Sequence, residues 1–168
     1  MSLIQTIKKS FLDFYHNIYK MFFFSFIFFI MVSALIYIAY FLFEFGFKYS
    51  YLIFINLLGP IILAMLMTIN NLISSKNPPL KQIFIFLKQY FFRGLISFML
   101  TLFIYAIIIF DIYFFFIKSS GSFLMMGSGI IFFYFFIIFS LIQIHFWNIL
   151  TLKPEKSIKF ALKQALYL

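Results

Sequence analysis

Apolar residues gather in four long runs along the chain, with short polar stretches between them. The runs cover residues 21–43, 51–73, 94–117 and 123–152. The hydrocarbon core of a bilayer is roughly 30 Å thick, and about 20 helical residues at about 1.5 Å each cross it. A helix satisfies its own backbone polar groups in that medium. The pattern therefore predicts an all-α membrane protein with four transmembrane helices.

The polar stretches carry a second pattern, in which apolar residues recur at helical spacing opposite lysines. In residues 1–20, Ile7, Phe11 and Ile18 share one helical face. Residues 80–93 and 154–168 are patterned alike, and Pro154 suits a first helical position. Helices of this kind lie in the membrane interface. We therefore expect amphipathic interfacial helices at the N-terminus, in the central loop and at the C-terminus, all within a single transmembrane domain over residues 1–168.

The basic residues are distributed unevenly over these segments. Three precede the first run, four lie between the second and third, and four follow the last, whereas the two remaining loops hold one each. Because Lys and Arg accumulate on the cytoplasmic side, we expect a multi-pass protein of the cell membrane with both termini in the cytoplasm. Six basic residues of the interfacial helices are predicted to meet anionic headgroups or, alternatively, a partner protein: Lys81, Lys88, Arg93, Lys156, Lys159 and Lys163.

Composition narrows the chemistry that this chain can perform. It is 65% hydrophobic and 10% charged, and it contains no cysteine and no catalytic signature such as H-E-x-x-H or G-x-S-x-G. The four acidic residues are scattered over separate segments, and the two histidines lie on different segments. We therefore expect no enzyme, no cofactor and no metal site. Nucleic acid is not an expected partner either, because the basic residues are spread over three membrane-bound segments.

Two positions within the runs depart from simple apolar sequence. Asp111 is an ionisable residue inside the third run, and such residues are functional candidates by default. No second acid lies inside a run, so a structural or interfacial role is favoured over a proton relay. In the second run, Gly59 and Pro60 should kink the helix and free the carbonyl of Asn56. A kink of this kind can shape a cavity, as broken helices do in transporters.

The third run also carries a face of small and weakly polar residues, Gly94, Ser97, Thr101 and Tyr105. Helices in lipid associate by close packing and polar contacts, so this face is predicted to pack against another helix. That helix belongs either to a partner protein or to this chain, beside Pro60, and the sequence leaves both open. Near the cytoplasmic end of the fourth run, a polar cluster of Gln143, His145 and Asn148 is expected to form interhelical hydrogen bonds, with Trp147 beside it as an interface anchor.

Several segments resemble the YesL-like family of bacterial membrane proteins. They are Gly59-Pro60 followed by a span with a small residue, Ala64; the aromatic and basic segment over residues 83–93; a span ending in Asp111; and the closing segment over residues 157–166. The resemblance implies association with the permease of a carbohydrate ABC importer. The function expected is then a non-enzymatic accessory subunit with the lipid bilayer and other membrane subunits as partners. Two alternatives stand beside it: a small channel or carrier acting as an oligomer, and a membrane regulator that links an importer to a sensor kinase.

Overall fold

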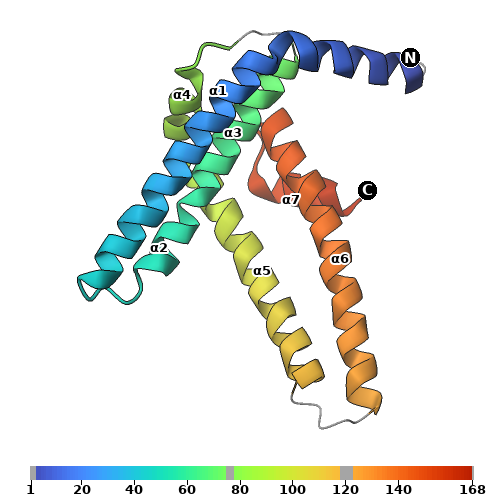
Figure 1. Cartoon of the computed structure of the whole chain (residues 1–168). Coiled ribbons are helices and arrows are strands. Elements are labelled where there is room, and N and C mark those ends of the chain that lie inside the picture. Colours follow the sequence, from blue (N-terminus) through green and yellow to red (C-terminus); the bar gives the residue numbers. More distant parts are fainter. Residues whose placement is uncertain (1–2, 75–77, 118–122, 168) are drawn as a thin grey trace. The chain divides into compact units, whose positions relative to one another are not determined.

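The computed structural model describes residues 3–74, 78–117 and 123–167, and within these ranges the chain contains helices and no strand. The predicted segments that reach residues 1–2, 75–77, 118–122 and 168 extend in part outside the described residues. Figure 1 shows the helices, which are α1 (Leu3–Glu44), α2 (Ser50–Asn56), α3 (Leu58–Ile73), α4 (Gln82–Gln89), α5 (Phe91–Ile117), α6 (Phe123–Leu152) and α7 (Ile158–Leu166).

Four stretches of these helices are long and apolar enough to cross a membrane: Ile18–Glu44, Ser50–Ile73, Phe91–Phe116 and Met125–Leu152. The predicted fold class, an all-α membrane protein with four spans, is confirmed. The chain divides into two compact units, residues 1–96 and 97–168, and the boundary falls inside α5. The expected single domain over residues 1–168 thus consists of two packing units, which are described one at a time.

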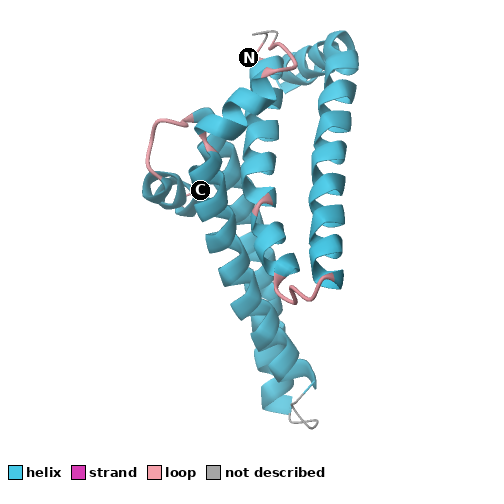
Figure 2. Cartoon of the chain, turned by 90° about the vertical axis from the view of Figure 1, so that its left-hand side faces the viewer, coloured by secondary structure: helices cyan, strands magenta, loops and turns pink. Residues whose placement is uncertain are grey.

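In the first unit, the predicted N-terminal helix and the first span form one helix. Helix α1 runs for 42 residues, about 63 Å, or roughly twice the thickness of the hydrocarbon core. The helix predicted over residues 1–20 continues into the first span without a break, because the sequence around Lys20 holds no proline or glycine to end it. Figures 1 and 2 show α1 turning between its N-terminal part and the remainder, so the two predicted parts still differ in direction.

The second span is interrupted. Helix α2 ends at Asn56, Leu57 separates it from α3, and Pro60 lies in the first turn of α3, where a missing backbone N–H is tolerated. Figure 2 shows this joint as a short loop within the span. Helix α3 packs against both α1 and α4. The buried core of the unit forms where these three meet, and it consists of Phe24, Ala64, Met65, Leu72 and Ile83.

Helix α4 is shorter than predicted, because Tyr90 forms a turn and α5 begins at Phe91. Residues 91–93, expected in the interfacial helix, therefore belong to the third span. Ile83 is completely buried and Phe86 packs against the same core, whereas Phe84 on the other side of α4 is exposed. A helix with apolar residues on two sides fits a position between a protein core and lipid.

In the second unit, residues of α5 and α6 pair along an antiparallel register. Phe98 lies edge-on to Trp147 near one end, and Phe115 stacks on Phe132 at a centroid distance of 5.3 Å toward the other. Aromatic pairs of this geometry add stability beyond the area that they bury. Side-chain rings therefore hold this hairpin along much of its length.

Helix α7 packs on α6 through a face that buries Ala161 and Ala165. It begins at Ile158 and not, as predicted, at Pro154. The Ser157 hydroxyl accepts a hydrogen bond from the backbone N–H of Phe160 at 3.2 Å, which is the N-cap arrangement that serine favours. The capping hydroxyl outcompetes the proline as the helix start, and Pro154 lies in the turn that precedes it.

Candidate functional site

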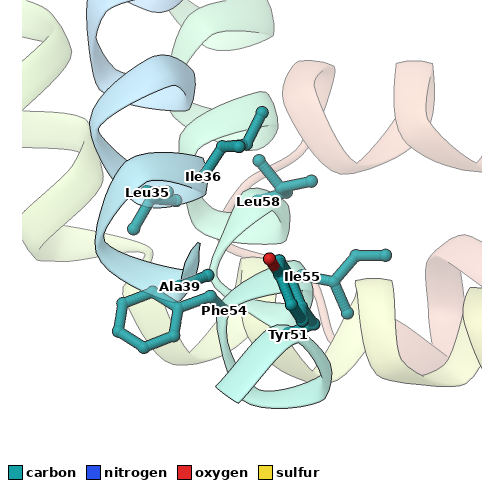
Figure 3. A pocket seen from close by; sticks show the side chains of 7 residues that line it. All are labelled: Leu35, Ile36, Ala39, Tyr51, Phe54, Ile55 and Leu58. Atoms are coloured by element: carbon teal, nitrogen blue, oxygen red, sulfur yellow. The ribbon is translucent and has the colours of Figure 1, made fainter. Parts of the chain in front are cut away.

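An apolar groove lies between α1 and the interrupted second span. It encloses about 260 Å³ and opens at one side. Helix α1 contributes Leu35, Ile36 and Ala39, α2 contributes Tyr51, Phe54 and Ile55, and α3 contributes Leu58 (Figure 3). The hydroxyl of Tyr51 is the one polar side-chain group in this lining. The groove is therefore suited to an apolar occupant and not to a sugar or an ion.

The groove exists because of two local features. Ala39 is a small residue in a run rich in phenylalanine. A larger side chain at this position would occupy the space that Ala39 leaves open. The break at Leu57 lets α2 follow a course different from that of α3. Helix α2 is nevertheless tied to α1 beside the groove, because the buried Ser50 hydroxyl donates a 2.9 Å hydrogen bond to the carbonyl of Ala39.

A second hollow, of about 450 Å³, lies at the turn that joins α1 to α2. Lys48 lines it together with the aromatic residues Phe47 and Tyr49. Phe54 lines both hollows, and on α1 the lining continues from Leu42 in this hollow to Ala39 in the groove. A cationic, aromatic mouth thus stands at the end of an apolar groove.

The predicted kink residues lie beside this groove. Gly59 and Pro60 are buried, and the side-chain amide of Asn56 donates a 2.7 Å hydrogen bond to the carbonyl of Leu52 one turn earlier. The helix is broken at Leu57, three residues before Pro60, so the interruption coincides with the end of the Asn56 turn. The cavity that the sequence left as an alternative is present on this side of the span.

Gly94 lies against the backbone of Gly59 and Pro60 within the first unit. A Cβ atom added to Gly94 would stand 2.6 Å from the Pro60 Cα and 2.8 Å from its nitrogen, both backbone atoms. Neither can give way by rotating a side chain. The start of α5 therefore touches α3 at a point where any side chain on residue 94 would separate the two helices.

The next two residues of the small-residue face are buried in the second unit. Ser97 is completely buried and Thr101 is 7% exposed. The Thr101 hydroxyl lies 2.9 Å from the carbonyl of Ser97 and 3.0 Å from the side-chain amide of Gln143 on α6. The interhelical hydrogen bond expected of Gln143 is confirmed. Trp147, the expected anchor, packs its ring against Phe98.

A hydroxyl has one proton, so Thr101 cannot donate to both acceptors. If the amide of Gln143 is turned so that its NH₂ group faces Thr101, the amide donates to the hydroxyl and the hydroxyl donates to the Ser97 carbonyl. With the Gln143 oxygen facing Thr101, the Gln143 nitrogen is buried without a partner, as is the Ser97 hydroxyl. The turned amide is the better assignment because it leaves fewer buried donors unsatisfied.

Tyr105 completes the face one turn further along α5. Its hydroxyl donates to the Ser140 hydroxyl at 2.9 Å, and Ser140 in turn donates to the carbonyl of Phe136 at 2.8 Å. The Tyr105 ring also contacts the rings of Phe136 and Phe139. The small-residue face is thus occupied inside the chain, by α3 at Gly94 and by α6 at Thr101 and Tyr105. Gly94 follows the internal alternative beside Pro60, whereas the contact of Thr101 and Tyr105 with the fourth span was not predicted.

The remaining predicted residues are spread over the surface. Asp111 is half-buried in α5 and has no ion pair or hydrogen bond within the described part of the chain, and Lys118 lies outside the described residues. The described residues hold no cluster of three metal-ligating side chains. The basic residues Lys81, Lys88, Lys156, Lys159 and Lys163 are exposed, and Arg93 is half-buried.

Sequence reasoning missed the part of the groove that α1 lines and the tie between Ser50 and Ala39. The signal was Ala39, since a small residue among large ones marks either close packing or a space. Comparison with known proteins adds no name to this arrangement: no protein-family model, curated protein or solved structure matches the chain.

Proposed function

We propose that this chain is a non-enzymatic accessory subunit that binds another integral membrane protein, and that its partner is the permease of a carbohydrate ABC importer. The observation that carries the association is the outward exposure of its spans. In the most apolar part of the first, third and fourth spans, 6%, 11% and 6% of the residues are buried, against 44% in the second. Three spans therefore offer most of their side chains to lipid or to a partner's helices.

The choice of partner class rests on the resemblance to the YesL-like family, and the charges support an inward-facing contact. Lys159 and Lys163 are exposed on α7, and Lys81 and Lys88 are exposed on and beside α4. Such helices can hold a partner's acidic cytoplasmic surface as well as anionic headgroups. The partner's helices would then lie against the exposed spans, and its cytoplasmic loops against α4 and α7.

The carrier alternative has one feature in its favour, the break in the second span. The groove beside that break is lined by apolar and aromatic side chains. Selective passage of a sugar needs a polar path with several hydrogen-bonding groups. The accessory role therefore accounts better for this groove.

Purification of the full chain from its native membrane in a mild detergent, followed by mass spectrometry of the proteins that accompany it, tests the proposal. We expect importer permeases to be enriched over a purification of an unrelated four-span protein. Enrichment of a sensor kinase without a permease would support the regulator instead. Solute flux in proteoliposomes that contain the purified chain alone would support the carrier.

The proposed orientation, with both termini in the cytoplasm, needs a separate test. The chain contains no cysteine, so a single cysteine at Ser75 reports one loop without background. We expect it to stay unlabelled by a membrane-impermeant maleimide added outside intact cells and to react after lysis. A cysteine at Lys48 is the matched position and should react without lysis. The reverse pattern overturns the orientation.

A further inference from the structure

We propose that the turn between α1 and α2 binds one phospholipid, with the lipid phosphate at Lys48 and one acyl chain in the groove between the two helices. The inference is independent of the partner proposed above. It rests on the order in which charged, polar and apolar groups follow one another down this face of the protein.

That order starts at the turn. Lys48 lies in the turn before α2, Tyr51 and Ile55 lie one turn apart on α2, and Leu58 begins α3, so the chain passes these residues in order along the second span. Lys48 lines the outer hollow, and the other three line the groove. A phospholipid has the same sequence of chemistry from its phosphate through its ester groups to its acyl chains.

The charge at the mouth favours a phosphate. Among the described residues, Lys48 forms no ion pair, and Phe47 and Tyr49 beside it are 65% and 74% exposed. Aromatic residues of this kind mark the headgroup level of a membrane. Lys48 is therefore held at the depth where lipid phosphates lie, in the outer leaflet if the charge asymmetry sets the orientation.

The Tyr51 hydroxyl stands at the next level down. It is the polar group of the groove lining, and it has no hydrogen-bond partner in the part of the chain that the structure describes (Figure 3). Tyr51 lies in the first turn of α2, three residues after Lys48. A lipid ester carbonyl can accept its proton, since the esters lie directly below the phosphate.

The groove below has the dimensions of one leaflet. From Ser50 to Leu58 the chain descends about 12 Å, which is most of the roughly 15 Å that one leaflet contributes to the hydrocarbon core. Its lining is apolar over this distance. One acyl chain can therefore lie along α1 and α2 and end at the break at Leu57.

Native mass spectrometry of the full chain in detergent, titrated with phosphatidylglycerol or phosphatidylcholine, tests the site. We expect one lipid to be retained per chain, with phosphatidylglycerol preferred. Lys48→Gln should weaken retention of phosphatidylglycerol by about fivefold, the factor expected for one lysine at an anionic surface. Lys8→Gln, which removes an exposed lysine of α1 in the same unit, is the matched control and should leave that retention unchanged.

A second pair of variants tests the groove without touching the charge. Ile36 lines the groove and is 60% exposed, whereas its neighbour Tyr37 is 69% exposed and does not line it. Ile36→Trp should fill the groove and abolish retention of both lipids, and Tyr37→Trp should preserve it. Equal retention by the two tryptophan variants would overturn the proposal, as would a loss on Lys8→Gln that matches the loss on Lys48→Gln. Thermal unfolding of each variant in detergent identifies any loss of lipid that follows from misfolding.

Discussion

The two units join their helices by different means. In the first, the start of α5 meets α3 backbone against backbone, at Gly94 and Pro60, and the surrounding core is apolar. In the second, α5 and α6 meet through hydroxyl and amide groups, from Thr101 to Gln143 and from Tyr105 to Ser140, and through stacked rings. Lipid is as apolar as the side chains, so burial alone favours no particular helix pair. The two units show two other ways to specify a helix pair: close approach of the backbones in the first unit and directed polar contacts in the second.

The largest loss of stability is expected from a substitution at Gly94, because the atoms that it contacts are backbone atoms that cannot move aside. Gly94→Ala places a Cβ atom 2.6 Å from a backbone carbon of Pro60, so α5 must shift away from α3. We expect a loss of about 3 kcal/mol, the upper end for overpacking. It would appear as a lower unfolding midpoint in detergent or as loss of the folded protein.

Two other glycines serve as matched controls for this substitution. At Gly129 the added Cβ would meet the ring of Phe116, which can rotate, and at Gly127 it would meet nothing within 4 Å. Gly129→Ala should cost less than Gly94→Ala, and Gly127→Ala should cost nothing, since alanine is the better helix former. Equal losses at all three positions would remove the distinction between backbone and side-chain contact.

The next effect concerns the buried polar pair of the second unit. Thr101→Val removes the partner of Gln143 and leaves its amide buried and unsatisfied, so we expect a loss of about 1 to 2 kcal/mol. Adding Gln143→Leu to Thr101→Val should recover part of that loss, because the orphaned amide is then removed. A double-mutant cycle by thermal or denaturant unfolding measures the coupling. Additive losses would mean that the pair does not hold the two helices.

Tyr105→Phe is a milder change at the same interface. It deletes one hydroxyl but keeps the ring contacts with Phe136 and Phe139, and Ser140 keeps its bond to the carbonyl of Phe136. We expect about 0.6 kcal/mol, the average for such bonds in a membrane protein. Tyr105→Ala should cost several times more. If the two variants unfold alike, the rings contribute little to the hairpin.

The smallest effect is expected at Asp111. The carboxylate is half-buried and lacks an ion pair among the described residues, so Asp111→Asn keeps the shape and removes a charge that nothing there balances. We expect unchanged or slightly raised stability and unchanged association with partners. Loss of solute flux in a folded, inserted Asp111→Asn protein would mean that Asp111 takes part in transport, and it would support the carrier alternative.

Much of this architecture is readable from sequence. The four spans follow from apolar runs, and the interhelical role of Gln143 follows from a buried amide in lipid. The faces by which the helices pack cannot be read from the sequence, because phenylalanine occurs on every side of these helices. Apolar residues contact lipid and protein alike. The groove depends on the path of α2 after the turn. The start of α7 depends on a serine cap three residues after the proline that suggested an earlier start.

The short turn at residues 45–49 bears on how the chain enters the membrane during synthesis. Gly46 adopts a φ of +91°, a backbone conformation that glycine accepts readily, and the Ser50 hydroxyl fastens the returning helix to Ala39. A nascent chain that has released α1 alone lacks both the returning helix and its fastening. With so little chain between them, we expect the first two spans to enter the membrane together as a helical hairpin.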